Sequence, residues 1–339
     1  MLLAILALSL PNQMSAQQYQ ILELRPLSGY SQSSAVSINE FGDVAGASSN
    51  GDLFSSQGTT WADGTSRSLG FMAKGTYCSA ADINNLGVAV GSANSGDPRP
   101  LAAVFGGRQA VSVSKGAFNS HAVHISDSGV ITGNYTKGTA LWQPAIWTPD
   151  ARKEGRYQQV LLPAYPDSLD NSVFNANESG EAVGFVASAS LGQRASIWSN
   201  DRRHSISILD QIGNEYGSIA NAINEGSQVV GTIFVGNGPL PAMWDLSSQR
   251  SFELPLPVGD QTGRATDIND LGDVVGQVGL EDRPVAWIGN EIVDLNIASD
   301  SESQGWILLN ATRINNSGWI VGDGLYQGQA RGFVLKPLQ

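Results

Sequence analysis

Apolar and polar residues follow a short pattern that recurs along the chain, Ala-x-x-Ile-Asn-x-x-Gly-x-Val-x-Gly, as at 35–46, 80–91 and 265–276. The segments on either side of the Asn-x-x-Gly stretch are short and rich in Ala, Ile and Val. Asn bonds its own backbone in turns, and Gly adopts positive φ without steric cost. Each copy therefore predicts a β-hairpin, and two glycines within five positions disfavour a helix.

The pattern occurs seven times. The closing glycines of successive copies lie 42 to 51 residues apart: Gly46, Gly91, Gly133, Gly184, Gly231, Gly276 and Gly322. Two copies depart from the pattern, with Ser227 at the turn-glycine position of the fifth and Ser126 at the Asn position of the third. A repeat of this length suits a four-stranded propeller blade.

Two further strands are expected in each repeat. The third ends in an aromatic residue in six repeats: Trp61, Phe105, Trp147, Trp198, Trp244 and Trp287. We expect these rings to pack between blades rather than to bind a ligand. A fourth apolar run follows, for example at 206–209 and 291–295.

The two ends of the chain complement each other. The seventh repeat ends at Gln339 without a fourth strand, whereas the apolar run 19–24 precedes the first hairpin and has no partner there. An N-terminal strand that completes the last blade would remove the open edge. The sequence therefore predicts an all-β fold, a single seven-bladed β-propeller over residues 17–339 with its ring closed by this strand. An open β-solenoid is the alternative, but it would not need such complementarity.

The repeat, together with the segment 305–337, resembles the HAF repeats of bacterial proteins thought to be extracellular, and the resemblance covers about residues 19–337. It implies export and a propeller-like β fold, and it implies no established chemistry. The His-Ala-Phe triplet of that family is not kept. The matching runs are Arg194-Ala195-Ser196 and Arg331-Gly332-Phe333, so no role of that histidine carries over.

Residues 1–16 differ from the rest of the chain. A nine-residue apolar run, 2–10, precedes Pro11 and a polar stretch to Ala16, as in a secretory signal peptide. The run is too short to cross a bilayer. We expect a bacterial protein that is secreted or held at the cell surface, with the periplasm as an alternative, and no membrane span. A buried N-terminal strand is the other interpretation, but the repeats leave it no place.

The formal net charge of −12 disfavours nucleic-acid partners, because an acidic surface repels phosphates. No Gly-rich phosphate loop opens a helix, and no Ser nucleophile elbow is present. We therefore expect no cofactor and no catalytic residue of a familiar type.

The single cysteine and a histidine pair also favour structural roles. Cys78 falls where other repeats carry serine, which indicates a small buried thiol rather than a nucleophile. His121 and His124 lie three residues apart on an expected strand. Such residues should point to opposite faces, so they are not expected to bind a metal together.

One column of the repeat varies while its neighbours hold Ala or Ile nearly throughout. Two residues before the turn Asn, the copies carry Ser37, Asp82, His124, Asn175, Ala222, Asp267 and Arg313. If this strand is innermost, these side chains lie on one circle around the axis. Convergent, varied polar groups are typical of a small-molecule site. We predict a ligand site formed by Asp82, His124, Asn175, Asp267 and Arg313. The alternatives are hydrogen bonding between blades and exposure to solvent.

Three functions fit these features. The first is a monomeric, non-catalytic binding or scaffold module for a glycan or a protein ligand. The second is a structural matrix component, which would show neither a localised pocket nor perturbed ionisable groups. The third is a polysaccharide hydrolase or lyase with Asp82 and Asp267 as its acid–base pair, which requires carboxyl groups about 5–10 Å apart. The absence of catalytic motifs favours the first function.

Overall fold

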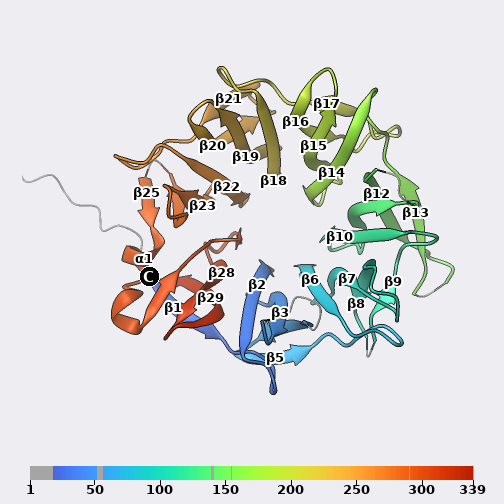
Figure 1. The fold of residues 1–339 in the computed structure, drawn as a ribbon, viewed down its shortest axis with the longest axis horizontal. Coiled ribbons are helices and arrows are strands. Elements are labelled where there is room, and N and C mark those ends of the chain that lie inside the picture. Colours follow the sequence, from blue (N-terminus) through green and yellow to red (C-terminus); the bar gives the residue numbers. More distant parts are fainter. Residues whose placement is uncertain are drawn as a thin grey trace, which may run out of the picture.

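The computed structural model describes residues 18–51, 56–107, 109–138, 141–153, 155–289 and 291–338. The predicted signal peptide, 1–16, lies outside this range. The described residues form seven antiparallel blades arranged as a ring around a central axis (Figure 1). The predicted seven-bladed β-propeller is confirmed, and the β-solenoid alternative is wrong.

Six blades share one strand order, from the axis outwards. Their first strands are β2 (Gln32–Ile38), β6 (Cys78–Ile83), β10 (Asn119–Ile125), β14 (Ser168–Ala176), β18 (Gly217–Ile223) and β22 (Gly263–Ile268). Their second strands are β3 (Val44–Ser49), β7 (Ala89–Ala93), β11 (Ile131–Thr136), β15 (Ala182–Ser188), β19 (Gln228–Val235) and β23 (Val274–Val278). The first and second strands are the hairpins that the repeat predicts.

The outer half of each blade is built from two more strands. The third strands are β4 (Gln57–Ala62), β8 (Leu101–Phe105), β12 (Gln143–Pro149), β16 (Gly192–Trp198), β20 (Gly238–Asp245) and β24 (Arg283–Ile288). The fourth strands are β5 (Thr65–Ser68), β9 (Val111–Ser112), β13 (Tyr157–Leu161), β17 (Ile206–Ile208), β21 (Arg250–Glu253) and β25 (Glu291–Asp294).

The seventh blade contains both ends of the described chain. Its elements are β26 (Trp306–Leu308), β27 (Arg313–Ile314), β28 (Ile320–Tyr326), β29 (Gln329–Pro337) and β1 (Tyr19–Leu24). β26 and β27 both pair with β28, and β1 pairs with β29 as the outermost strand. The predicted closure by the N-terminal strand is therefore confirmed. Two short helices, α1 (Leu295–Ala298) and η1 (Glu302–Gln304), connect this blade to the sixth.

A β-bulge explains the closing glycine of the repeat. In each of the first six blades, the register of the first strand shifts just before the variable polar column, for example between Ala35 and Ser37. The bulge brings a carbonyl oxygen of the first strand over the closing glycine. A Cβ added at the closing glycine of these six blades would lie only 1.9 to 2.1 Å from that oxygen, and one at Gly322 of the seventh blade would lie 2.1 Å from the carbonyl oxygen of Asn310. Only glycine avoids this overlap.

The hydrophobic core is divided into layers between neighbouring blades. One such layer joins Ala222 and Val230 of the fifth blade to Ile268 and Trp287 of the sixth. The aromatic side chains of the third strands are buried there, as predicted, and four indole N–H groups donate to backbone carbonyls of the segments that precede each first strand. None of the helices in the described ranges has the length and apolar character that a membrane crossing requires.

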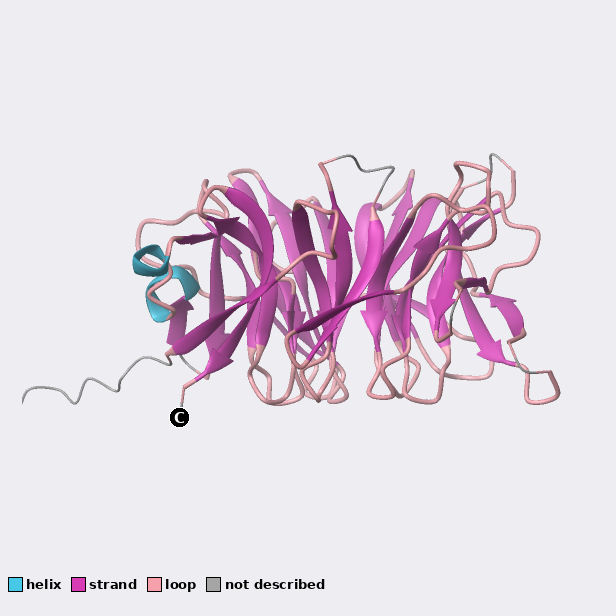
Figure 2. Ribbon diagram, turned by 90° about the horizontal axis from the view of Figure 1, so that it is seen from below, coloured by secondary structure: helices cyan, strands magenta, loops and turns pink. Residues whose placement is uncertain are grey.

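The turns between the first and second strands of all seven repeats lie at one face of the ring, which we call the turn face. Figure 2 shows a row of tight turns along one face, next to the C-terminal end. Pairing of Ile320 with Leu335 places that end beside the turn of the seventh blade. The connections from second to third strands lie at the opposite face.

Candidate functional site

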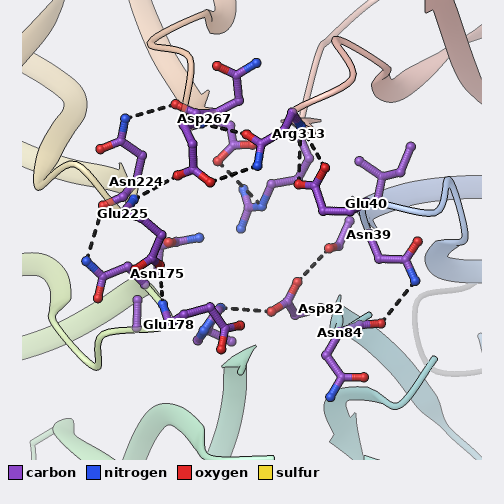
Figure 3. Close-up of a pocket in the computed structure, with 18 of the residues that line it drawn as sticks. Asn39, Glu40, Asp82, Asn84, Asn175, Glu178, Asn224, Glu225, Asp267 and Arg313 are labelled. Atoms are coloured by element: carbon purple, nitrogen blue, oxygen red, sulfur yellow. Dashed lines mark hydrogen bonds and ion pairs between the residues drawn. The ribbon is translucent and has the colours of Figure 1, made fainter. Parts of the chain in front are cut away.

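A cavity of about 260 Å³ lies where the ring axis meets the turn face. Its wall is formed by the ends of the first strands and by the turns that follow them, with contributions from all seven blades (Figure 3). Ser37 and all five predicted site residues line it: Asp82, His124, Asn175, Asp267 and Arg313. The cavity is below the range of about 300–1,000 Å³ that is usual for drug-sized ligands, so it suits one small group.

Asp82 is the centre of a hydrogen-bond network that spans three blades. Its Oδ1 accepts a hydrogen bond from Ser37 Oγ at 2.6 Å. Its Oδ2 accepts one from the backbone N–H of Ile125 at 2.9 Å and lies 3.0 Å from His124 Nδ1. Burial favours a raised pKa, but the bonds from His124, Ser37 and Ile125 outweigh it and lower the pKa of Asp82. Asp82 is therefore an anion at neutral pH.

Asp267 occupies the same repeat position but behaves differently. Its Oδ2 accepts a hydrogen bond from the backbone N–H of Ile314 at 2.8 Å, while Arg313 Nε stays 3.9 Å from Oδ1. Burial raises the pKa of Asp267 to about 6, although the Arg313 charge and the Ile314 N–H act in the opposite direction. This carboxyl group is therefore partly protonated in mildly acidic solution.

The variable column thus has both of the roles that the sequence offers as alternatives, hydrogen bonding between blades and lining a cavity. Ser37, Asp82 and Asp267 bond to the following blade, and the same residues also line the cavity. Ala222 of the fifth blade is fully buried and is absent from the lining. Within the described residues, His124 Nε2 is buried without a hydrogen-bond partner. The wall of the cavity is therefore held rigidly, while one ring nitrogen keeps unused hydrogen-bonding capacity.

A second ring of side chains surrounds the mouth of the cavity, and sequence reasoning missed it. It consists of the residues directly after the turn Asn: Glu40, Asn85, Asp127, Glu178, Glu225, Asp270 and Asn316, here called the acidic rim. Each side chain accepts a hydrogen bond from the backbone N–H of the rim residue one blade earlier. Asn316 N–H closes the circle by donating to Glu40 at 3.1 Å. The available signal was a column that holds only Asp, Glu or Asn in all seven copies.

The turn Asn residues bind neighbouring blades together beneath this rim. In six blades the side-chain amide of the turn Asn donates to the backbone carbonyl of the next blade's turn. The side-chain oxygen accepts N–H groups of its own turn. The six residues are Asn39, Asn84, Asn177, Asn224, Asn269 and Asn315. Ser126 of the third blade caps its own turn at 3.1 Å through Val130 N–H. An Asp would lack the donor, which explains the preference for Asn.

The cavity has a strong excess of negative charge. Seven carboxyl groups line it against a single guanidinium, that of Arg313: Glu40, Asp82, Asp127, Glu178, Glu225, Asp267 and Asp270. Burial, followed by nearby carboxylates, raises the pKa of Glu40 and of Glu178, although rim N–H groups counteract the shift. Among the described residues, no group of three or more His, Cys, Asp or Glu side chains is arranged to hold a metal ion.

Two other sequence expectations are settled by local contacts. The expectation that His121 and His124 point to opposite faces is wrong, because the bulge between Ala122 and His124 restores both to one side of the sheet. They contact different partners there: His121 bonds Ser92 Oγ at 2.8 Å, and His124 contacts Asp82. Cys78 is buried as predicted, and burial raises its thiol pKa to about 11, which opposes nucleophilic chemistry.

One solved structure shares the fold of this chain at low sequence identity. The extracellular domain of a B. thetaiotaomicron protein described as a one-component system shares 9% identity with this chain, with a TM-score of 0.56. The match covers 94% of this chain and 40% of that one. A gluconolactonase from Xanthomonas campestris shares 12% identity over 94% of this chain and 90% of its own, with a TM-score of 0.42, too low to indicate a shared site. No family model and no curated protein sequence matches the chain, so the HAF-repeat assignment stays a prediction.

Proposed function

We propose that this chain is a non-catalytic binding module that holds a glycan or a protein ligand in the axial cavity of the turn face, at or outside the surface of a bacterial cell. The observation that carries the proposal is the convergence of Asp82, His124, Asn175, Asp267 and Arg313, from five blades, on one cavity. Bonds between blades hold Asp82, His124 and Asp267 in position, and such preorganisation lowers the entropic cost of binding.

The site itself argues against a purely structural matrix component. That function predicts neither a localised pocket nor perturbed ionisable groups. The cavity is localised at one end of the axis, and the pKa of Asp267 is raised to about 6 within it. Perturbed carboxyl groups in a cleft are a feature of functional sites.

A glycan array and a protein-ligand screen test the proposal. The probe is the purified protein, compared with Asp82→Ala/His124→Ala/Arg313→Ala and with the milder Arg313→Gln. Arg250→Ala/Glu253→Ala on the exposed, outermost strand β21 is the matched control. We expect selective binding that both cavity variants weaken and the control keeps, with thermal unfolding used to verify folding. Binding that survives in a folded cavity variant would place the ligand elsewhere and refute the proposal.

Export is tested separately from binding. The signal-like segment 1–16 and the HAF resemblance support it. We expect the full chain, expressed in a bacterium, to appear outside the cytoplasm, and a chain that lacks 1–16 to remain inside. Equal retention of both forms in the cytoplasm would contradict export.

Cleavage of a polysaccharide is a second candidate, favoured by one observation. Asp82 and Asp267 line the same cavity, and their pKa values shift in opposite directions, as in pairs that divide the acid and base roles. The test is release of reducing ends from a polysaccharide panel. Loss of turnover with retained binding in Asp267→Asn would establish an enzyme, whereas binding without any release would leave only the binding module.

A further inference from the structure

The turn face is apolar along one half of the ring. Phe41, Leu86 and Leu271 are exposed by 75%, 73% and 72%, and each is the second residue after the turn Asn of its blade. In the third, fourth, fifth and seventh blades, that position holds Ser128, Ser179, Gly226 and Ser317. Exposed apolar side chains that gather beside a cavity mark interaction surfaces, whereas isolated ones do not.

Trp319 of the seventh blade adds an aromatic ring between the turns of the sixth and first blades, with Lys336 Nζ 4.6 Å from its centre. Its ring lies against the turn of the first blade, because a Cβ on Gly42 would come within 2.6 Å of it. An arc therefore runs through neighbouring blades from Leu271 over Trp319 to Phe41 and Leu86; we call these four residues the apolar arc. Three of them directly follow a rim residue, and Trp319 lies three residues after one. None of the four lines the axial cavity itself, so the arc lies on the turn face outside the acidic rim.

The chemistry of the cavity selects a cation. Seven carboxyl groups face one guanidinium, and no Phe, Tyr or Trp is among the lining residues, so a sugar ring would find no aromatic platform. Each rim carboxylate accepts one backbone N–H, and three of them also accept one side-chain donor. They therefore retain further acceptor capacity. The volume of about 260 Å³ suits a single side chain. A lysine or arginine side chain supplies the charge and the donors that this cavity lacks.

We propose that the ligand is a protein segment that inserts a lysine or arginine side chain into the axial cavity and packs flanking apolar side chains on the apolar arc. This inference rests on the proposed function and selects a protein over a glycan. A buried anchor residue surrounded by a larger apolar contact is the arrangement that concentrates binding energy in protein interfaces. The serine-bearing turns of the third and fourth blades would remain outside the apolar contact.

The test uses an array of short peptides in which a central Lys or Arg is flanked on both sides by Leu, Phe or Ser. Matched peptides carry Gln at the centre. We expect the protein to prefer the basic centre with apolar flanks by about tenfold or more over the Gln peptides. Raising the ionic strength from about 0.05 to 0.5 M should weaken binding, because salt screens exposed charges.

Variants separate the two halves of the interface. Phe41→Ser/Leu86→Ser/Leu271→Ser copies the serine of other blades and should remove the preference for apolar flanks. Glu178→Gln/Glu225→Gln should reduce the preference for a basic centre. Val258→Ser/Leu280→Ser, at two exposed apolar residues of the opposite face, should change neither. The apolar-arc variant and the Glu178→Gln/Glu225→Gln variant change exposed side chains and are expected to fold normally, which thermal unfolding verifies.

Four outcomes would overturn the inference. Equal binding of basic and Gln peptides would show that the cavity does not select a cation. An unchanged preference for apolar flanks in Phe41→Ser/Leu86→Ser/Leu271→Ser would show that the apolar arc makes no contact with the ligand. Selective binding of glycans alone, lost in Asp82→Ala/His124→Ala/Arg313→Ala, would overturn the inference and leave the proposed function standing. Binding of neither class would count against both.

Discussion

At the closing glycine of each hairpin, one methyl group would be enough to disrupt the blade. We expect Gly231→Ala to lower the free energy of unfolding by about 3 kcal/mol, because its Cβ would lie 2.0 Å from the carbonyl oxygen of Ile219. Urea unfolding followed by tryptophan fluorescence measures the change. Gly236→Ala in the same blade is the control, since nothing lies within 4 Å of its added Cβ. Equal stability of the two variants would contradict this account of the glycine.

Asp323 connects the seventh blade to the first and should make stability depend on pH. Its carboxylate accepts a hydrogen bond from Ala35 N–H at 2.8 Å, and burial raises its pKa to about 6. Because the folded state holds this proton more tightly than the unfolded chain, the contribution of Asp323 is most favourable at low pH. It is lost as pH rises from about 4 through 6.

Asp323→Asn tests that assignment. Asn134 makes the equivalent contact in the third blade, accepting from Val173 N–H at 2.9 Å, so an amide fits this position. We expect the variant to be more stable than the original protein by roughly 1–2 kcal/mol at pH 7, with the difference vanishing near pH 4. Urea unfolding at pH 4, 5, 6 and 7 gives the comparison, in which the other carboxyl groups with raised pKa values, such as Asp267, are the same in both proteins. A difference independent of pH would show that Asp323 does not titrate in this range.

Among the elements, the turns do more than reverse the chain. Ser126 is the one turn residue without the amide that bonds to the next blade in the six other turns. We expect Ser126→Asn to stabilise the protein by about 1 kcal/mol by adding a buried bond to the fourth blade, and Asn269→Ser to destabilise it by about 1–2 kcal/mol. Thermal unfolding measures both.

The exposed Ser128 provides the control for this prediction. It lies in the same turn as Ser126, and the two hydroxyl oxygens are 2.8 Å apart. Ser128→Asn therefore adds an amide without the bond between blades and loses only this exposed contact, so it should change the melting temperature little. If Ser126→Asn behaved like Ser128→Asn, the amide bonds would contribute little to blade association.

At the scale of the whole molecule, stability depends on closing the ring. β1 pairs with β29 over six residues, and Tyr19 and Ile21 are buried against the core of the last blade. We expect a chain that begins at Arg25 to unfold at lower temperature and to self-associate, because the exposed edge of β29 can pair with another chain. Sedimentation velocity and thermal unfolding test this. A chain that begins at Gln18 retains β1 and is the control; identical behaviour would show that closure is dispensable.

Much of the architecture is predictable because its causes are local in sequence. Turn residues and apolar alternation act over a few positions, so the seven-fold count, the hairpins, the buried Trp column and the unpaired strand 19–24 could be inferred from the chain alone. The same reasoning located Asp82, His124, Asn175, Asp267 and Arg313 as one column. Equivalent positions of a closed ring must converge on its axis, and these five do line one cavity.

The remaining features depend on which residue of one blade meets which residue of the next, over separations of more than 40 positions. The circle of bonds in the acidic rim and the arc from Leu271 to Leu86 are of this kind. The bulge that places His121 and His124 on one side instead depends on the pairing of β10 with β11 within one blade. The opposite pKa shifts of Asp82 and Asp267 show the reason most directly. The two residues share one repeat position, but three donors reach the first and Arg313 stays at a distance from the second. Sequence determined the ring and the column, whereas tertiary contacts alone decided the charge and shape of the site.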